Sequence, residues 1–511
     1  MRAFGLAVVA FVAGACKHTA GDTITDAASS VDAMADAAIA AAHDPCKPFA
    51  MPSADALFAS TKKVFAHYFY PFPLSIDNKP SGSDYYNTQY LSPSGESDKW
   101  LANGGYLRAR PLAIAPSTAT DWQIENMKVE VRMAIAAGIS GFTVDVLGTD
   151  QTVAGSQLQN LLAAAAAVDP RFAIVVMPDV SALGSAATAS TLESIIASVA
   201  TSPSAYHLAD GRLVASAFDA SLVPAATWST AFADLAGSGI DVAFVPTFLG
   251  WQASASAFAS VSYGFADWGT ATPASAIASE TAPAAAQAMG KIFMSPVDPE
   301  QYRPKDFIYW EAGNSAAFRD AWTSAITGGA DWIQLVTWSD FSESSVVEPY
   351  TDATLAGDLG TGYYDLTAYY ATWFLTGAAP VIDHDVLYYF YRREPVAAAD
   401  PNQATPTTAQ GPAGSDRVEL VGFLTAPGTL EITFGSDTAT MDAPAGVTSF
   451  SVPLQAGVPQ FGLSRGSAAI ISAPGPIEIA GSGGLASGTL DLTYWSGSVS
   501  SDGTCQLQAQ R

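Results

Sequence analysis

Residues 332–344 of the chain are WIQLVTWSDFSES, an apolar run followed by a loop that carries two carboxylates. The apolar run is typical of the last buried strand of a large domain. Asp340 and Glu343 stand three residues apart just beyond it. A buried strand supports such groups rigidly, and the loop after it leaves them open to solvent and substrate. The stretch therefore predicts acid/base chemistry at the end of a strand.

Seven further β-rich runs precede this strand and alternate with Ala-rich helical stretches between about residues 60 and 380. The expected strands span residues 64–70, 141–147, 172–178, 212–218, 241–248, 261–265, 291–295 and 332–338. Such alternation is typical of the α/β class, in which helices wrap a parallel sheet. Eight strands in this span predict a (β/α)8 TIM barrel over residues 60–380.

The stretches between the strands carry helical signals. In residues 121–137, Ile124, Met127 and Val131 recur at three- and four-residue steps. Further helices are expected over residues 156–168, 190–200 and 315–327. Residues 71–120 are instead rich in Pro, Ser, Gly, Asn and Tyr, and they follow the first strand. A long aromatic segment at this place favours a functional loop at the barrel mouth.

The texture of the sequence changes after residue 380. Alternating segments separated by Gly, Pro and Asp turns replace the Ala-rich helices. The expected strands are residues 417–424, 429–434, 448–452, 468–472 and 489–495, and residues 395–415 are expected to form a polar loop. This spacing predicts a C-terminal all-β sandwich over residues 381–511, used as an accessory domain.

The N-terminus has the pattern of a secretion signal. Residues 1–16 hold one positive charge, a short apolar stretch and small residues before Cys16. The sequence before Cys16 resembles the lipobox of bacterial lipoproteins, which predicts a lipidated Cys16, and ordinary cleavage beside an incidental cysteine is the alternative. Residues 17–59 are expected to form a flexible tether and lead-in. Together they predict a secreted or cell-surface lipoprotein of a bacterium, attached to a membrane only through its lipid.

The two remaining cysteines stand near the two ends of the folded part. Cys46 lies at its start and Cys505 close to the C-terminus. In an oxidising compartment the two thiols could form a disulfide that joins the ends of the chain.

The charge of the chain excludes several partners. Lys and Arg number 22 against 48 Asp and Glu, so the net charge is −26. Phosphate backbones and anionic lipid head groups are repelled, which argues against nucleic-acid binding. A neutral polysaccharide meets no such barrier, and the many aromatic side chains could stack on sugar rings. A monomer that acts on a glycan is expected.

Polar residues at the C-terminal ends of barrel strands converge on one mouth. His67, Asp145 and Asp179 have such positions and are expected to bind substrate. Asp219 and Asp298 also follow strands, and no role is assigned to them. The alternative for His67 and Asp145 is a satisfied buried hydrogen bond, and for Asp179 a turn or helix cap. The tryptophans expected to offer stacking surfaces are Trp100, Trp251, Trp268 and Trp338.

Asp340 and Glu343 have the composition that glycosidic bond cleavage requires. One carboxylic acid protonates the departing oxygen, and one carboxylate activates water or attacks carbon. The alternative is a helix capping box, but no sustained apolar helix follows the pair. The five histidines have no zinc-ligand spacing, and neither a serine nucleophile elbow nor a phosphate-binding loop is present. No metal and no cofactor are therefore expected.

Several segments together resemble glycoside hydrolase family 71, the α-1,3-glucanases or mutanases. The similar segments are residues 63–69, 134–142, 210–216, 244–246, 294–297, 365–370 and, most specifically, 336–344. The last resembles the family motif Trp-Asn-Asp-Tyr-Gly-Glu-Ser, with Ser339 in place of Asn and Ser342 in place of Gly. The resemblance implies inverting endo-hydrolysis of α-1,3-glucan by Asp340 and Glu343. Glu343 is expected to be the general acid and Asp340 the base.

Two other functions stay open at this point. The first is a glycan-binding surface lipoprotein whose barrel has lost catalysis, with Ser339 and Ser342 as symptoms of that loss. The second is a related barrel hydrolase that acts on another α-glycan, such as a mannan. A reducing-end assay on a panel of polysaccharides discriminates among the three.

Overall fold

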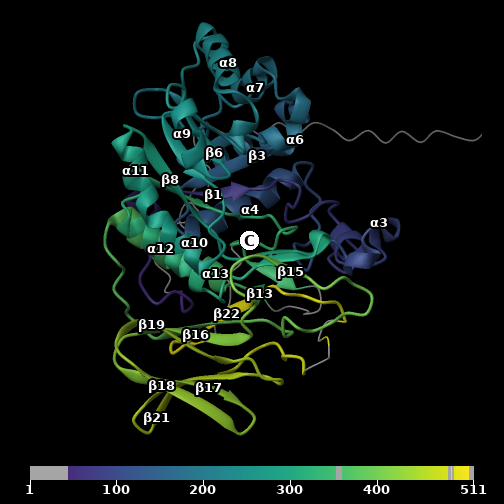
Figure 1. Cartoon of the computed structure of the whole chain (residues 1–511), viewed down its shortest axis with the longest axis vertical. Coiled ribbons are helices and arrows are strands. Elements are labelled where there is room, and N and C mark those ends of the chain that lie inside the picture. Colours follow the sequence, from purple (N-terminus) through teal and green to yellow (C-terminus); the bar gives the residue numbers. More distant parts are fainter. Residues whose placement is uncertain (1–43, 353–358, 482–484, 486–487, 504, 506–511) are drawn as a thin grey trace, which may run out of the picture. The chain divides into compact units, whose positions relative to one another are not determined.

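The computed structural model describes residues 44–352, 359–481, 485, 488–503 and 505 (Figure 1). The described residues from Asp44 onward form one compact unit. The expected signal segment, Cys16 and most of the expected tether lie outside the described residues. None of the helices in the described part of the chain combines the length and the apolar character that a bilayer crossing requires.

The unit is built around a closed barrel of eight parallel strands, which confirms the predicted TIM barrel. The strands, in their order around the barrel, are β1 (Lys63–Tyr68), β3 (Gly141–Val146), β4 (Ala173–Pro178), β5 (Leu213–Ala217), β6 (Val242–Phe248), β7 (Gly264–Asp267), β8 (Ile292–Val297) and β11 (Trp332–Leu335). Every residue of β3, β4 and β5 is buried. Strands that are covered on both faces consist of continuous apolar runs, and for this reason the barrel strands could be predicted from the sequence.

Helices cover the outside of the barrel strands (Figure 1). They are α4 (Trp122–Ala136), α5 (Gln157–Val168), α6 (Val180–Leu183), α7 (Ala189–Ala197), α8 (Ala225–Gly237), α9 (Trp251–Phe258), α10 (Pro273–Ala278), α11 (Ala282–Ala288), α12 (Ala316–Thr327) and α13 (Gly362–Thr376), and a short α2 (Ala54–Phe58) precedes β1. In α4, Met127, Val131 and Ala134 are buried on one face. Gly138, with a φ of 76°, follows that helix in the left-handed region, as a helix stop requires.

Three insertions follow the C-terminal ends of β1, β8 and β11 and therefore lie at the barrel mouth. The first holds η1 (Tyr86–Tyr90), α3 (Gly95–Asp98), η2 (Leu101–Asn103) and β2 (Ala109–Pro111); the second holds β9 (Gln301–Arg303), η7 (Pro304–Asp306) and β10 (Ile308–Trp310); the third holds β12 (Tyr350–Asp352) and β13 (Leu359–Gly360). Strand β2 pairs with β12, so the first and third insertions share a small sheet.

Two four-stranded antiparallel sheets follow the barrel, as predicted. One has the order β19 (Gly446–Pro453), β16 (Arg417–Leu424), β14 (Val386–Tyr391) and β22 (Trp495–Ser500); the other has the order β18 (Asp437–Ala443), β17 (Gly428–Phe434), β20 (Gln460–Arg465) and β21 (Ala468–Pro474). The strand expected over 489–495 is wrong, because β22 begins only at its last residue. The loop expected over 395–415 contains β15 (Thr407–Gln410), which pairs with β10 of the barrel insertion.

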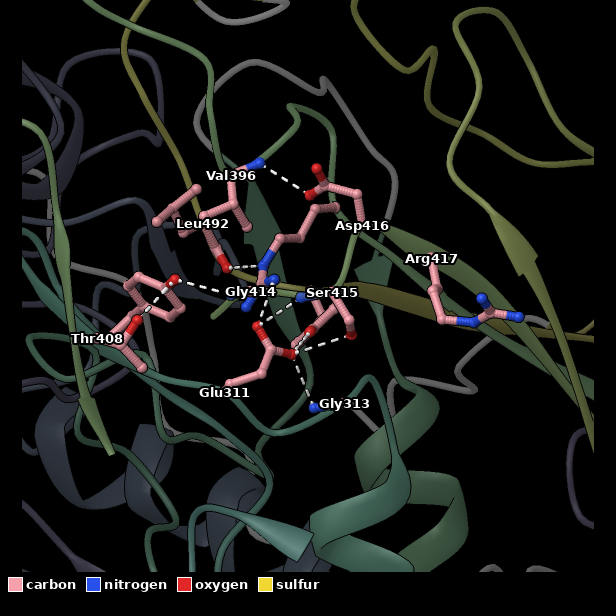
Figure 2. Close-up of polar contacts among 12 residues, drawn as sticks. Glu311, Gly313, Val396, Thr408, Gly414, Ser415, Asp416, Arg417 and Leu492 are labelled. Atoms are coloured by element: carbon pink, nitrogen blue, oxygen red, sulfur yellow. Dashed lines mark hydrogen bonds and ion pairs between the residues drawn. The ribbon is translucent and has the colours of Figure 1, made fainter. Parts of the chain in front are cut away.

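A buried ion pair joins the second insertion to the C-terminal part. Arg392 is 2% exposed, and its Nη1 lies 3.0 Å from Oε2 of Glu311. The guanidinium lies over the Tyr494 ring, 4.1 Å from the centroid. Figure 2 shows Glu311 pointing at the backbone N–H groups of Gly313 and Ser415, which donate to it at 3.0 and 3.2 Å. We call this cluster, Glu311, Arg392, Ser415 and Tyr494, the seam.

Cys46 and Cys505 are both free thiols in the structure, so the predicted disulfide is not formed there. The two residues are nevertheless neighbours in the structure, because Cys505 contributes to the raised pKa of the Cys46 thiol. The disulfide between them stays a prediction.

Candidate active site

Asp340 and Glu343 lie in the loop after β11, at the C-terminal end of the barrel. The loop folds back on itself, since Val347 N donates to Thr337 O at 3.0 Å. It is also attached to β1, where Trp338 N donates to His67 O at 2.7 Å. Thr337 Oγ1 accepts the N–H of Asp340 at 2.8 Å. These backbone contacts fix the start of the loop and therefore the position of Asp340.

The Asp340 carboxyl is buried and accepts several hydrogen bonds on one oxygen. Ser342 donates to Oδ1 through its backbone N at 3.0 Å and through its hydroxyl at 2.7 Å. Glu343 N donates to the same oxygen at 3.3 Å. Burial raises the pKa of Asp340, whereas the Ser342 hydrogen bonds act to lower it. Donors of this kind favour the ionised form of the carboxyl.

Glu343 differs from Asp340 in exposure and in its partner. Its side chain is 16% exposed, and its Oε2 lies 2.7 Å from Nη2 of Arg303 on β9. Burial raises the pKa of Glu343 to about 7, with a further contribution from Asp340 and an opposing one from Arg303. A carboxylic acid with this pKa holds or releases a proton near neutrality, as a general acid must. The two carboxyl groups thus have environments suited to different roles.

His67 on β1 and Asp145 on β3 lie beside the pair. His67 Nε2 is 3.9 Å from Asp145 Oδ2, a distance too long for a hydrogen bond. Burial lowers the pKa of His67 to about 3, so its ring is neutral. The pKa of Asp145 is raised well above its usual value by burial and by the charges of Asp179 and Asp340. Asp145 therefore belongs to the same cluster of acids as the pair.

Unpartnered atoms distinguish this cluster from ordinary buried polar groups. His67 Nδ1 and Asp145 Oδ1 are buried and have no hydrogen-bond partner within the described part of the chain. A fully satisfied structural pair would leave neither atom bare, because an unpaired buried polar group costs free energy. The arrangement suits groups that wait for the hydroxyls of a ligand.

Asp179 has the capping role that the sequence also allowed. It is the N-cap of α6, and its Oδ1 accepts from Ala182 N at 3.0 Å and from Ser181 Oγ at 2.6 Å. Its proximity to Asp145 is nevertheless real, since its charge contributes to the raised pKa of that residue. Asp179 thus closes a turn beside the site.

The four tryptophans divide into two pairs. Trp251 is 2% exposed and packs on Phe265 and Phe293, with centroids 5.7 and 5.2 Å away, while Trp338 is fully buried. The prediction that these two offer stacking surfaces is wrong, because neighbouring side chains enclose both rings. The position of these residues next to strand ends did not predict their burial. Trp251 is the first residue of α9 and Trp338 lies in the loop after β11, and both rings are enclosed there.

Trp100 and Trp268 keep partly exposed rings. Trp268 meets the edge of His67, with ring centroids 4.8 Å apart. Trp100 lies in the first insertion and stacks on Tyr106 at 4.7 Å. Tyr106 is itself close to the pair, because Ser342 and Asp340 both influence its pKa, which burial raises to about 12.

Sequence reasoning gave no role to Asp298 and missed Arg303. Asp298 is fully buried just after β8 and accepts from Thr270 N at 2.6 Å. Burial raises its pKa to about 8, and Glu343 contributes to the increase. Its place at a strand end was a usable signal. Arg303 offered none, because it lies in an insertion and its contact with Glu343 arises only in three dimensions.

A cavity of about 500 Å³ lies at the opposite end of the barrel. Its lining includes Lys63, Ser140 and Ala173, which stand at the starts of barrel strands. The one carboxylate of this lining, Asp55, is paired with Arg171 at 2.6 Å. The cavity therefore lacks the two carboxyl groups that the mouth supplies.

Comparisons with known proteins identify relatives of this chain. A family model described as glycosyl hydrolase family 71 matches residues 115–508. The glucan endo-1,3-alpha-glucosidase agn1 of Schizosaccharomyces pombe is 26% identical over 381 residues, which cover 70% of this chain and 87% of the relative. The ascus wall endo-1,3-alpha-glucanase of the same organism is 24% identical over 393 residues, covering 69% and 88%. Among solved structures, the GH99 endo-alpha-mannosidase from Bacteroides thetaiotaomicron is 20% identical, with a TM-score of 0.47, over 61% of this chain and 97% of that one.

The matched region begins before α4 and continues into the C-terminal sheets, so it includes the loop of Asp340 and Glu343. It covers far more than half of the chain, and the two yeast relatives are matched over most of their length. The chain therefore belongs to glycosyl hydrolase family 71 and is a glycoside hydrolase.

Proposed function

We propose that the protein hydrolyses α-1,3-glucan at internal linkages, with Asp340 and Glu343 as the catalytic pair. The observation that carries the proposal is the pair itself, two neighbouring carboxyl groups at the C-terminal end of a closed barrel. The substrate is inferred from the names of the relatives, which are α-1,3-glucanases and a mutanase.

Glu343 is the general acid in this proposal. Its pKa of about 7 keeps it protonated in mildly acidic solution, and its partial exposure gives a leaving oxygen access to its proton. Asp340 is the base that activates water. The hydrogen bonds from Ser342 and Glu343 to its Oδ1 support the ionised form that a base needs.

The remaining mouth residues bind substrate. The bare Nδ1 of His67 and Oδ1 of Asp145 are available to sugar hydroxyls. Burial raises the pKa of Asp145 well above its usual value, which favours the protonated carboxyl group, a donor to sugar hydroxyls. Trp268 and Trp100 offer ring faces to the C–H faces of glucose units. Asp179 caps α6, and its backbone N donates to the oxygen of Val146, the residue after Asp145, at 3.0 Å.

The stereochemistry is proposed to be inverting. In that mechanism one carboxyl group protonates the leaving oxygen while the other activates water on the opposite face of the sugar. Proton NMR of the first product formed from a soluble α-1,3-linked oligosaccharide checks this point. A β-anomer as the initial product supports inversion, and an α-anomer contradicts it.

The function is tested by release of reducing ends from α-1,3-glucan. Asp340→Asn and Glu343→Gln each lower the rate by about 100-fold or more, since general acid/base catalysis supplies 10²–10⁴-fold. Asp234→Asn and Glu478→Gln, exposed positions elsewhere in the molecule, serve as matched controls and retain full activity. Full activity in either dyad variant would contradict the assignment.

A panel of other α- and β-linked polysaccharides accompanies this assay. Cleavage of an α-mannan but not of α-1,3-glucan would move the proposal to another α-glycan. Sedimentation with insoluble glucan without any soluble product would indicate a glycan-binding protein instead.

The proposal places the enzyme outside the cell as a monomer. The secretion pattern of residues 1–16 and the ascus wall location named for one relative support an extracellular place of action. Lipidation of Cys16 is tested by metabolic labelling with palmitate. Cys16→Ser abolishes the label if the cysteine is the anchor, and an unlabelled wild type indicates ordinary cleavage.

A further inference from the structure

Strand β9 is attached directly to the catalytic loop. Tyr302 N donates to the backbone oxygen of Glu343 at 2.9 Å. The next residue, Arg303, extends its guanidinium to the side chain of the same glutamate, at 2.7 Å between Nη2 and Oε2. Backbone and side chain of Glu343 are thus both held by neighbouring residues of one short strand.

Arg303 is itself held before any substrate arrives. Its guanidinium lies over the ring of Trp310, 4.8 Å from the centroid. Trp310 belongs to β10, which pairs antiparallel with β9 and places Ile308 opposite Arg303. The Arg303 side chain is only 26% exposed. An ion pair in this setting loses less to side-chain entropy and screening than a pair in open solvent.

The hairpin of β9 and β10 is supported from the C-terminal part of the chain. Tyr302 is 1% exposed, and its hydroxyl donates to Leu490 O at 3.4 Å. Arg108 of the first insertion donates to the same oxygen at 2.9 Å. The seam fixes the residue after β10, Glu311. The Arg303 guanidinium is therefore carried by a rigid support.

We propose that Arg303 is a positioning residue for the general acid, which orients the Glu343 carboxyl and favours the release of its proton. The proposal rests on the proposed function of Glu343. The Arg303 guanidinium is a positive charge and a hydrogen-bond donor, and both properties favour the ionised form of Glu343. Arg303 therefore opposes the effects of burial and of Asp340 on the Glu343 pKa. Without Arg303 the acid keeps its proton more tightly and donates it less readily.

Among the charged groups around Glu343, Arg303 is the one placed to stabilise the ionised carboxyl directly. Asp340, Asp145 and Asp298 are acids whose pKa values burial raises. Lys305 lowers the pKa of Glu343 from a longer distance. Within the described residues, Arg303 is the cation in direct contact with the Glu343 carboxyl.

The test compares Arg303→Met, Arg303→Lys and the matched control Arg212→Met. Arg212 also pairs with a carboxylate, Asp210 at 2.7 Å, and lies 4.9 Å over an aromatic ring, but it is far from the loop in sequence and belongs to no part of the site. The pH profile of kcat/KM is measured on a soluble α-1,3-linked oligosaccharide.

In Arg303→Met, the alkaline limb of the profile moves upward by about 1 pH unit or more, because an opposite charge in contact shifts a carboxyl pKa by 1–3 units. Arg303→Lys returns most of this shift, and Arg212→Met leaves the profile unchanged. A uniform loss of rate with both limbs in place would make Arg303 merely structural. Movement of the acidic limb instead would assign Glu343 to the base and overturn the proposal.

A second measurement needs no substrate. Proteins labelled with ¹³C at glutamate Cδ are titrated by NMR, and the Glu343 signal is identified through Glu343→Gln. The Glu343 pKa rises in Arg303→Met relative to the wild type, and an unchanged pKa refutes the proposal. If the wild type cleaves no α-1,3-glucan, the proposed function fails, while this titration still decides whether Arg303 controls the acid. Thermal unfolding of each variant identifies any that is not folded.

Discussion

Ser342 stands where the resembling family motif has Gly, and its hydroxyl donates to Asp340, the proposed base, at 2.7 Å. The left-handed backbone angle of this loop falls on Ser344, with a φ of 55°, so Ser342 needs no glycine-like freedom. Ser339, in place of Asn, accepts from Phe69 N at 3.1 Å and donates to Phe69 O at 3.2 Å. Both serines thus make hydrogen bonds that hold the loop. Their presence in place of Asn and Gly is therefore no sign of lost catalysis.

Removal of the Ser342 hydroxyl weakens the support for ionised Asp340. In Ser342→Ala the pKa of Asp340 rises further, so the acidic limb of the pH profile moves upward by about 1 unit. This follows because a hydrogen bond to a charged group contributes about 1.5–3 kcal/mol and one pKa unit corresponds to about 1.4 kcal/mol.

The control is Ser221→Ala, whose hydroxyl likewise donates to an aspartate two residues earlier, Asp219, but on the surface. Its profile stays that of the wild type. An unmoved acidic limb in Ser342→Ala would show that this hydroxyl does not act on the base.

At the scale of strands and helices, the sequence predicted those elements in which the pattern of apolar residues matches the face that the element buries. The eight barrel strands and helices such as α4 and α12 were found for this reason. The segment before β22 shows where this reasoning stops. Leu490, Leu492 and Tyr494 alternate and are buried as a strand predicts. Tyr494 N, however, donates to the side chain of Glu300 rather than to a neighbouring strand.

The same limit applies to the site. Asp340, Glu343, His67 and Asp145 could be predicted because they stand at strand ends, which converge in any barrel of this kind. Arg303 could not be predicted, because its role depends on how an insertion folds over the mouth. Trp251 shows the converse, since a suitable position in sequence gave no information on the direction of its ring.

The seam makes a prediction for the elements that it joins. Arg392→Met leaves Glu311 as an unpaired buried carboxylate and lowers the free energy of unfolding by about 3–5 kcal/mol. Glu311→Gln leaves the guanidinium unpaired and has a comparable effect. The double variant loses less than the sum of the two, because neither charge then remains alone.

Chemical denaturation of the four proteins of this cycle measures the coupling. Arg212→Met and Asp210→Asn, an exposed pair, form the matched cycle and change stability by less than about 1 kcal/mol. Strict additivity in the seam cycle would mean that the two charges do not stabilise each other.

At the scale of the whole molecule, several buried acids have strongly raised pKa values. Burial raises the pKa values of Glu130, Asp298 and Asp365 to about 8. In the unfolded chain such groups titrate near pH 4. The folded state therefore binds more protons between these values, and the free energy of unfolding decreases as the pH rises from about 4 to 8.

Thermal unfolding measured across this pH window checks the prediction. The Tm decreases steadily toward pH 8, and Asp365→Asn makes the decrease shallower because one titrating group is removed. Asp234→Asn on the surface of α8 leaves the slope unchanged. A Tm that rises between pH 4 and 8 would contradict the assignment of these acids.

The contact between Cys46 and Cys505 also belongs to this scale. Oxidation of the pair would join residues at opposite ends of the described chain, and a disulfide typically stabilises a protein by about 2–4 kcal/mol, with a larger effect for a longer loop. Mass mapping without reductant detects the bond. The Tm of the oxidised wild type then exceeds that of Cys505→Ser, and adding a reductant removes the difference. Two free thiols in protein isolated under oxidising conditions would refute the prediction.

The support that Leu490 and Tyr494 give to the β9–β10 hairpin has a consequence for biosynthesis. A nascent chain holds Asp340 and Glu343 long before its last residues are made, yet the contacts of Leu490 and Tyr494 with the hairpin region form only once those residues have been added. On the proposed mechanism, we expect chains that end before residue 490 to carry both acids and to hydrolyse glucan more slowly than the full chain.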